Sequence, residues 1–298
     1  MMRKFVAKNY AGYTFLLPWL IGFFALAVGP IVSSFYLSFT KYDIASAPEF
    51  IGVENYEYMF VWDGRFWQSL KVTFTYVFLS VPGTLIFALA VAMLLDRNIR
   101  AIGLYRALFY LPSILGGSIA VAILWRQLFS NEGVVNSILA MVAVDGPYWL
   151  SDPDFSLYTL VVLAVWQFGS PMLIFLAGLR AIPQELYEAA EIDAAGPIKR
   201  FFSITLPLLA PVMFFNLVLQ MIEAFKTFNS AFVISDGRGN PLDSLLFLTL
   251  YLYNEAFSYF RMGYASALAW VLLAIIGVFT AIAFATSKYW VHYENERG

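Results

Sequence analysis

The chain has 298 residues, of which 61% are hydrophobic and 13% are charged, and its formal net charge is −2. Soluble domains contain about 45–50% apolar and about 25% charged residues, so this composition excludes an ordinary soluble protein, and no basic tract indicates nucleic-acid binding. The chain contains no cysteine, which excludes disulfides, thiolate metal sites and cysteine nucleophiles.

Six apolar stretches are each long enough to cross a hydrocarbon core about 30 Å thick. In chain order they cover residues 13–37, 69–95, 107–129, 157–182, 208–234 and 262–287. The first run continues past a stretch that resembles a signal-peptide cleavage site, residues 25–27, and its length predicts an uncleaved span. The segments between the spans are too short to hold a second domain. We therefore predict an all-α integral membrane protein with one domain, residues 1–298.

Basic residues gather on alternate connecting segments. One side carries eleven of the eighteen: Arg3, Lys4, Lys8, Arg97, Arg100, Arg106, Arg180, Lys199, Arg200, Lys288 and Arg297. The opposite segments are rich in acidic residues. Because cytoplasmic segments carry the excess of Lys and Arg, this pattern predicts that both termini and the loop of residues 183–207 are cytoplasmic.

Several motifs that would indicate an enzyme are absent from the sequence. There is no G-x-x-x-x-G-K-[ST] phosphate loop and no G-x-S-x-G elbow. The single histidine, His292, lies in the C-terminal tail. One histidine without cysteine argues against a zinc site or a histidine-based triad. We predict no catalytic residue, no metal ligand and no cofactor on this chain.

Polar residues form a stripe along the fifth span. Asn216, Gln220, Glu223 and Thr227 share an arc about 60° wide, and Lys226 is within i,i+3 reach of Glu223. Ionisable residues inside a membrane are costly and usually face a bundle interior or an aqueous cavity. The stripe predicts the wall of a solute pathway. A structural Glu223–Lys226 pair with polar packing between subunits is the alternative.

Two tryptophans, Trp166 and Trp270, fall in the middle of the fourth and sixth spans. An aromatic face can cover the C–H surface of a bound solute, so both are candidate pathway residues. Lipid contact or core packing explains mid-span tryptophans equally well.

The loop of residues 183–207 has the pattern of a helix, a turn and a second helix. Pro183 suits a first helical turn, acidic residues follow near the positive helix end, and Gly196-Pro197 stops the helix. A helix lying on lipid would carry Lys and Arg on its polar face, whereas this one is acidic, so a protein partner is favoured. We expect Glu188, Ala189 and the end at residues 194–196 to meet that partner and Ile192 to pack toward the membrane.

This loop resembles the "EAA" loop of membrane subunits of bacterial ABC importers. Glu188, Ala189, Ala190, Ile204, Leu206 and Pro207 match its pattern, while Ala194 replaces the family glycine and Gly196 follows two positions later. The segments LLPWLIGFFALAVGPIVSSFYLSFTKYD, FIGVENYEYMF and LYRALFYLPSILGGSIAVAILWRQLFSNEGVVNSIL resemble carbohydrate importers of the maltose and glycerol-phosphate type, and more closely the first of their two paired permeases.

The resemblance implies a permease subunit in a bacterial inner membrane. Its partners would be a second, similar permease, two cytoplasmic ATPase subunits that hold ATP and Mg²⁺, and an extracytoplasmic solute-binding protein. In that family the loop helix docks on the ATPase, which assigns Glu188, Ala189, Ala190, Asp193, Ala194 and Gly196 to coupling. The alternatives are an ion-coupled secondary sugar carrier, which would place carboxylates near the midplane, and a membrane scaffold or sensor, which needs no polar stripe.

Overall fold

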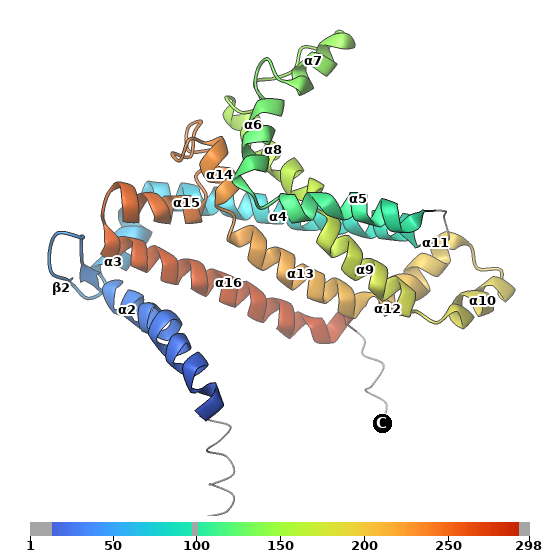
Figure 1. Cartoon of the computed structure of the whole chain (residues 1–298), viewed down its shortest axis with the longest axis horizontal. Coiled ribbons are helices and arrows are strands. Elements are labelled where there is room, and N and C mark those ends of the chain that lie inside the picture. Colours follow the sequence, from blue (N-terminus) through green and yellow to red (C-terminus); the bar gives the residue numbers. More distant parts are fainter. Residues whose placement is uncertain (1–13, 97–100, 292–298) are drawn as a thin grey trace, which may run out of the picture. The chain divides into compact units, whose positions relative to one another are not determined.

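The computed structural model describes residues 14–96 and 101–291 (Figure 1). Contacts divide the described chain into two compact units. One contains residues 14–63 and 252–271, and the other contains residues 64–96, 101–251 and 272–291. Helix is the dominant structure in both, and the one sheet among the described residues has two short strands.

The first unit begins with an apolar helix and a short hairpin. The helix covers Thr14–Leu37 and includes the π-helical turn η1 (Phe24–Val28) and α2 (Gly29–Leu37). The antiparallel strands β1 (Thr40–Lys41) and β2 (Glu49–Phe50) follow, with Thr40 opposite Phe50. The remaining elements are α3 (Glu54–Glu57), η2 (Tyr58–Trp62), η4 (Asn254–Ser258) and the first residues of α16 (Met262–Trp290).

A charged cluster ties the end of η4 to the start of α16 within this unit. The Arg261 guanidinium lies 3.1 Å from the Glu255 carboxylate and 5.2 and 4.7 Å from the ring centroids of Tyr58 and Tyr264. Glu255 is only 3% exposed. A buried carboxylate needs a paired cation, and the two aromatic faces hold that cation in place.

The second unit contains most of the helices. In chain order they are α4 (Gly64–Leu95), α5 (Ile102–Leu115), α6 (Ile119–Leu128), α7 (Val134–Met141), α8 (Pro153–Trp166), α9 (Gly169–Ala181), α10 (Gln184–Ile192), α11 (Pro197–Arg200), η3 (Phe201–Thr205), α12 (Leu206–Leu208), α13 (Ala210–Phe225), α14 (Asn229–Ile234), α15 (Leu248–Tyr253) and the rest of α16.

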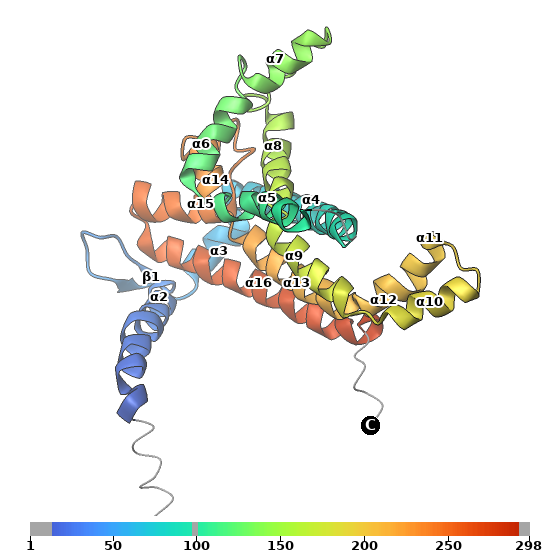
Figure 2. The ribbon, with the colours of Figure 1, turned by 45° about the vertical axis from the view of Figure 1, so that its right-hand side comes forward.

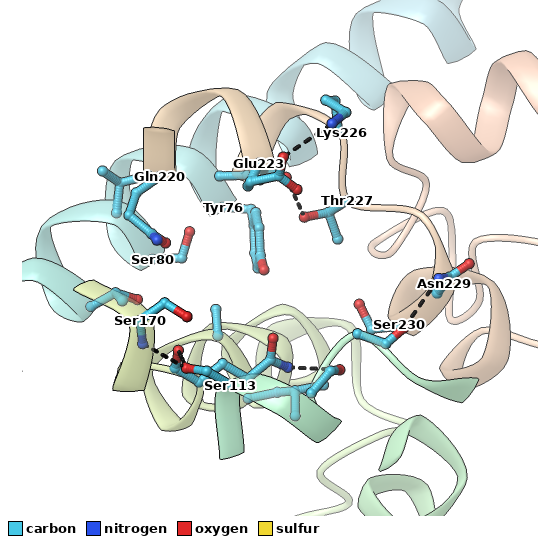
Figure 3. Close-up of a pocket in the computed structure, with 18 of the residues that line it drawn as sticks. Tyr76, Ser80, Ser113, Ser170, Gln220, Glu223, Lys226, Thr227, Asn229 and Ser230 are labelled. Carbon is cyan, nitrogen blue, oxygen red and sulfur yellow. Dashed lines mark hydrogen bonds and ion pairs between the residues drawn. The ribbon is translucent and has the colours of Figure 1, made fainter. Parts of the chain in front are cut away.

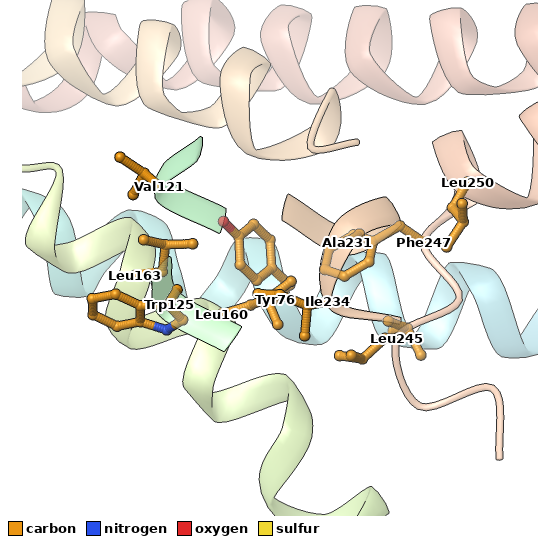
Figure 4. Packing of buried hydrophobic residues seen from close by; sticks show 11 residues of the cluster. Tyr76, Val121, Trp125, Leu160, Leu163, Ala231, Ile234, Leu245, Phe247 and Leu250 are labelled. Atoms are coloured by element: carbon orange, nitrogen blue, oxygen red, sulfur yellow. The ribbon is translucent and has the colours of Figure 1, made fainter. Parts of the chain in front are cut away.

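Helix α4 is the centre of this unit, as Figures 1 and 2 show. It packs against α8, α9 and α13, while α5 runs along α9 and α6 lies on α14. One cluster of buried side chains joins α4 to α9 around Ala88, Met172 and Phe175. A second joins α4, α6, α8 and the segment before α15 around Tyr76, Trp125 and Phe247 (Figure 4). Large apolar side chains on the outer faces, such as Ile86 and Phe78, remain exposed, as expected for helices surrounded by lipid.

The helices agree with the predicted spans in most places. Four described helices are long and apolar enough to cross a membrane: Thr14–Leu37, Gly64–Leu95, Ala210–Ile234 and Met262–Trp290. Two bent pairs, α5 with α6 and α8 with α9, bring the number to six if each pair counts as one span. This arrangement is the all-α membrane fold that composition and apolar length indicated.

Treating residues 107–129 as a single helix is wrong. The chain turns by 99° between α5 and α6, because Gly116 and Gly117 interrupt the helix and Ser118 caps the next one by accepting from the Val121 N–H. A milder bend of 42° follows Trp166, and the fifth span is interrupted between Phe225 and Asn229.

The orientation of the chain remains a prediction from the charge pattern. Of the basic residues that support it, Arg3, Lys4, Lys8, Arg97, Arg100 and Arg297 lie outside the described residues. Because the chain has no cysteine, single cysteines can report the side of the membrane. Ser46→Cys and Ser151→Cys should react with an impermeant thiol reagent in intact cells, and Ser203→Cys should react only after the cells are opened. All three serines are exposed, so the reverse labelling pattern would contradict the predicted orientation.

Candidate functional site

A cavity of about 570 Å³ lies inside the second unit (Figure 3). Its walls come from α4, α13, the start of α14 and the two bends, α5–α6 and α8–α9. About half of the lining is polar, including side chains at Ser113, Gln167, Ser170, Gln220 and Asn229. Irregular backbone and polar side chains at membrane depth are tolerated where they line a water-filled cavity or are buried in protein.

The helix breaks around the cavity exchange hydrogen bonds that satisfy their freed backbone groups. The Gln167 Nε2 donates to the Gly116 carbonyl at 3.1 Å, and the Asn229 Nδ2 donates to the Gly117 carbonyl at 3.3 Å. A Cβ on Gly116 would lie 2.3 Å from the Gln167 Cδ, so glycine leaves the space that this amide needs. Side chains from the α8–α9 and α13–α14 breaks thus satisfy the backbone carbonyls that the α5–α6 break leaves without a helical donor.

One hydroxyl closes the break between α8 and α9. The Ser113 Oγ donates to the Gln167 carbonyl at 2.6 Å and accepts from the Ser170 N–H at 2.9 Å. The approach of α5 to α9 is very close here, because a Cβ on Gly169 would lie 2.7 Å from the Phe109 carbonyl oxygen. Small residues at both helices therefore shape the cavity wall.

Three members of the predicted polar stripe lie together on the cavity wall. Gln220 and Glu223 line it from α13 and Thr227 from the break that follows this helix, and Figure 3 shows them around the open space. The Lys226 Nζ lies 3.0 Å from the Glu223 Oε1, and both side chains are more than half exposed. Spacing along a helix was sufficient to find this wall.

The fourth member of the stripe lies elsewhere. Asn216 is 1% exposed, and its Nδ2 donates to the Pro171 carbonyl at 3.3 Å in the contact between α13 and α9. It is not part of the cavity lining. Its place in the helical arc is as expected, but α9 packs over that end of the arc and converts the amide into a helix–helix contact.

The two mid-span tryptophans are not among the cavity residues either. The Trp166 ring lies 5.9 Å from the Trp125 ring on the α6 side of α8. The Trp270 ring makes an edge contact with Phe35 at 4.7 Å within the first unit. In both cases the described contacts are aromatic packing.

Sequence reasoning missed the contribution of α4 to the cavity. Tyr76, Ser80 and Thr84 line it, at intervals of four residues on one face of that helix. Hydroxyl side chains are common in membrane helices, so they do not stand out as a carboxylate or an amide does. Their regular spacing was the signal that could have revealed them.

The predicted helix and turn of the 183–207 loop are present. Helix α10 ends at Ile192, and Ala194 adopts the left-handed conformation with φ of 55°. Its N–H donates to the Glu191 carbonyl at 3.0 Å, and the N–H of Ala195 donates to the Ala190 carbonyl at 2.9 Å. Glycine is the residue that adopts this conformation without steric cost, so Ala194 occupies a glycine-type helix cap, as the family pattern indicated. Gly196 has a β conformation and precedes α11.

Arg200 fastens the second half of the loop to the first. Its Nε donates to the Ala195 carbonyl at 2.7 Å, and its guanidinium lies 3.2 Å from the Glu191 carboxylate. The hydroxyls of Tyr187 and Thr205 share a hydrogen bond of 2.9 Å at the base of the loop. These bonds make the loop one compact piece with both helices joined.

The expectation for Ile192 is wrong. Its side chain is 87% exposed, whereas Tyr187 of the same helix packs against the buried cluster between α4 and α9. Glu188, Ala189 and Asp193 are exposed as well, and Ala190 is partly buried. The outer face of α10 therefore combines acidic, small and apolar side chains without a partner in the described chain.

Residues 58–290 match the family described as binding-protein-dependent transport system inner membrane component. The chain belongs to this family. The resemblance inferred from the EAA loop is therefore confirmed, and so are the multi-pass inner-membrane location and the transport role of the permease. Because the family transports by an ATP-binding-cassette mechanism, the ion-coupled carrier considered as an alternative is no longer supported.

The permease has close relatives along nearly its whole length. It is 54% identical over 295 residues to the probable ABC transporter permease protein YesP of Bacillus subtilis strain 168, covering 99% of this chain and 96% of the relative. The arabinooligosaccharides transport system permease protein AraP of the same organism is 31% identical over 288 residues, with 95% and 90% covered. The trehalose/maltose transport system permease protein MalF of Thermococcus litoralis is 33% identical over 287 residues, with 93% and 94% covered.

A solved structure has the same fold. It is a bacterial alginate ABC transporter in complex with an alginate pentasaccharide-bound periplasmic protein, and one of its chains gives a TM-score of 0.81 at 21% identity, with 96% of both chains covered. The helical arrangement of the permease is therefore that of an ABC importer subunit.

Proposed function

We propose that the permease forms half of the translocation path of an ATP-driven importer for a sugar or oligosaccharide. The polar cavity carries this proposal, because Gln220, Glu223 and Thr227 present amide, carboxylate and hydroxyl groups inside otherwise apolar helices. Groups of these kinds hydrogen-bond the hydroxyls of a carbohydrate. Relatives named for arabinooligosaccharides and for trehalose and maltose support this substrate class.

We further propose the partners with which the path works. A second permease of the same fold closes the open side of the cavity, and an extracytoplasmic solute-binding protein delivers the sugar. Two ATPase subunits hold ATP and Mg²⁺ and receive the exposed face of α10. No chemistry and no cofactor then falls to this chain, which converts the closing of the ATPases into alternating access of the cavity.

Removing the polar groups of the α13 wall should impair transport without dismantling the complex. Gln220→Leu and Glu223→Leu should each reduce uptake about 3- to 10-fold, since each deletes about one hydrogen bond to the solute. Uptake is measured in proteoliposomes that contain the permease pair, the ATPases and the solute-binding protein. The Lys226→Met variant should matter more for an anionic sugar than for a neutral one, because it removes the cation of the wall.

Two comparisons separate a path from a structural role. Thr286→Leu on the exposed face of α16 is the matched control and should transport normally, because its hydroxyl bonds only to its own helix. Asn216→Leu should instead lower the amount of assembled complex, because it removes the side-chain hydrogen bond that joins α13 to α9 at the Pro171 carbonyl. Normal uptake by both wall variants, or loss of the second permease on purification, would contradict the assignment of the wall.

A further inference from the structure

Helix α10 is held in place by very little packing. None of its nine residues is buried, and Figure 2 shows the loop projecting beyond the ends of α9 and α13. A second cavity, of about 260 Å³, lies under the loop, with Met93 and Asp96 of α4 on one side and Pro197, Arg200 and Phe201 of the loop on the other. The angle at which α10 stands to the membrane helices is therefore set by a few specific contacts and not by a packed core.

Among the described residues, side chains tie α10 to the second half of the loop at two places. Near the start of α10, Tyr187 packs against the buried cluster between α4 and α9 and shares its hydrogen bond with Thr205. At the other end, the Arg200 Nε donates to the Ala195 carbonyl at 2.7 Å, and the Arg200 Nη2 donates to the Glu191 Oε1 at 3.2 Å. We call the contacts of Arg200 with Ala195 and Glu191 the loop clamp.

The turn between α10 and α11 depends on this clamp. The backbone N–H groups of Ala194 and Ala195 bond back into α10, and that of Arg200 bonds to the Gly196 carbonyl, so each bond stays on its own side of the turn. Ala194 has a φ of 55°, a conformation that costs free energy for a residue with a Cβ, and a Cβ on Gly196 would meet no atom within 4 Å. The Arg200 side chain is the group that joins the two sides across this strained and unpacked turn.

The geometry of the clamp uses the guanidinium and not the positive charge alone. Arginine presents its N–H donors in one rigid plane, so Arg200 can hold a carbonyl and a carboxylate at the same time. The Glu191 side chain is 69% exposed, and an exposed ion pair contributes little. The bond from Nε to the Ala195 carbonyl is therefore the stronger part of the clamp. A lysine at this position has a single ammonium on a flexible chain and cannot reproduce the planar arrangement.

We propose that Arg200 is a positioning residue for transport, because the loop clamp makes α10 and α11 one rigid unit. This inference rests on the proposed function, in which the ATPases act on α10. Helix α11 continues through η3 and α12 into α13, which carries part of the cavity wall. With the clamp closed, a displacement of α10 reaches α13. Without it, the turn at residues 194–196 bends and absorbs the displacement.

The test compares Arg200→Met with Lys199→Met, which removes the same charge from the exposed neighbouring residue. Uptake of radiolabelled arabinotriose, trehalose and maltose and ATP hydrolysis are measured in the same proteoliposomes with the complete transporter. For the best transported sugar, Arg200→Met should lower the amount of sugar imported per ATP about 3- to 10-fold, with the ATPase still attached and the KM for the sugar unchanged. Lys199→Met should keep the wild-type ratio. Arg200→Lys should restore only part of it, and Glu191→Gln should remain close to wild type, because the bond to the Ala195 carbonyl is intact.

A second measurement is independent of the sugar. In the purified complex, backbone amides of residues 193–196 should exchange hydrogen about 10-fold faster in Arg200→Met than in Lys199→Met, as read by mass spectrometry, because opening of the turn no longer breaks the clamp.

Three results would overturn the role of Arg200 while leaving the importer function intact: equal exchange in the two variants, an unchanged ratio of sugar to ATP in Arg200→Met, or loss of the assembled complex in that variant. A wild-type complex that imports none of the three sugars would count against the proposed function itself, and the exchange rates would still decide whether Arg200 holds the turn.

Discussion

Replacing Ala189 by tryptophan should strongly reduce transport while the permease remains folded in the membrane. Ala189 is exposed on α10, so an indole ring there meets nothing in its own chain. If the proposed ATPase subunits bind this face, they can approach the helix closely only because alanine is small. The added ring would occupy the space that the ATPase needs. We expect the ATPase to detach or to hydrolyse ATP without sugar uptake, with uptake reduced at least about 10-fold, the effect of about 1.4 kcal/mol.

The control for this change is Gln184→Trp, which adds the same ring to the same helix about 140° away and should have little effect. Glu188→Lys should act in the same direction as Ala189→Trp by reversing a charge beside it. Uptake, ATP hydrolysis and co-purification of the ATPase are measured on the same preparations, and suppressor mutations should map to the ATPase. Normal transport by Ala189→Trp with its ATPase attached would show that the loop is not the coupling element.

Placing a methyl group on Gly169 should destabilise the whole permease. The new Cβ would lie 2.7 Å from the Phe109 carbonyl oxygen, 2.8 Å from the Tyr110 Cα and 2.9 Å from the Ser113 Oγ. Two of these atoms belong to the backbone of α5, so a side-chain rotation cannot relieve the contact, and the helices must separate. Overpacking of this kind costs about 1–3 kcal/mol and sometimes more.

The measurement for Gly169→Ala is the temperature at which half of the detergent-solubilised complex is lost to aggregation, together with the yield from membranes. Gly277→Ala is the matched control, because it lies within α16 with no atom inside 4 Å of its new Cβ, and alanine is a better helix former than glycine. We expect Gly277→Ala to be neutral or stabilising. Equal melting of the two variants would show that the contact between α5 and α9 is not as tight as described.

The sequence was most informative where one local pattern controls the structure. Apolar length predicted the helices, and acidic and alanine-rich composition followed by Gly196-Pro197 predicted the turn after α10. Helical spacing placed Gln220, Glu223 and Thr227 on one wall. In each case a single element determines the outcome, so no knowledge of neighbouring helices was needed.

The predictions that failed concern features that depend on which neighbouring element packs against the residue, and the local sequence does not show this. Asn216 belongs to the same helical arc, but α9 covers it. The 99° turn was hidden because apolar length does not register Gly116-Gly117 as a break. Ile192 was expected to pack toward the membrane helices, but its side chain is exposed, and exposed apolar residues occur where a partner binds. The hydroxyl side chains that line the cavity from α4 were overlooked since no single one of them is unusual.

The position of the helix breaks has a consequence for motion. The helix pairs α5–α6, α8–α9 and α13–α14 are all interrupted at the level of the cavity. When two helices rotate about a hinge, the residues nearest the hinge move least. The capping bonds from Ser113, Gln167 and Asn229 involve side chains, so these joints can flex by rotating side chains while the ladders of the flanking helices stay intact. The walls around a bound solute would thus keep their geometry while the distant ends, α10 among them, travel furthest.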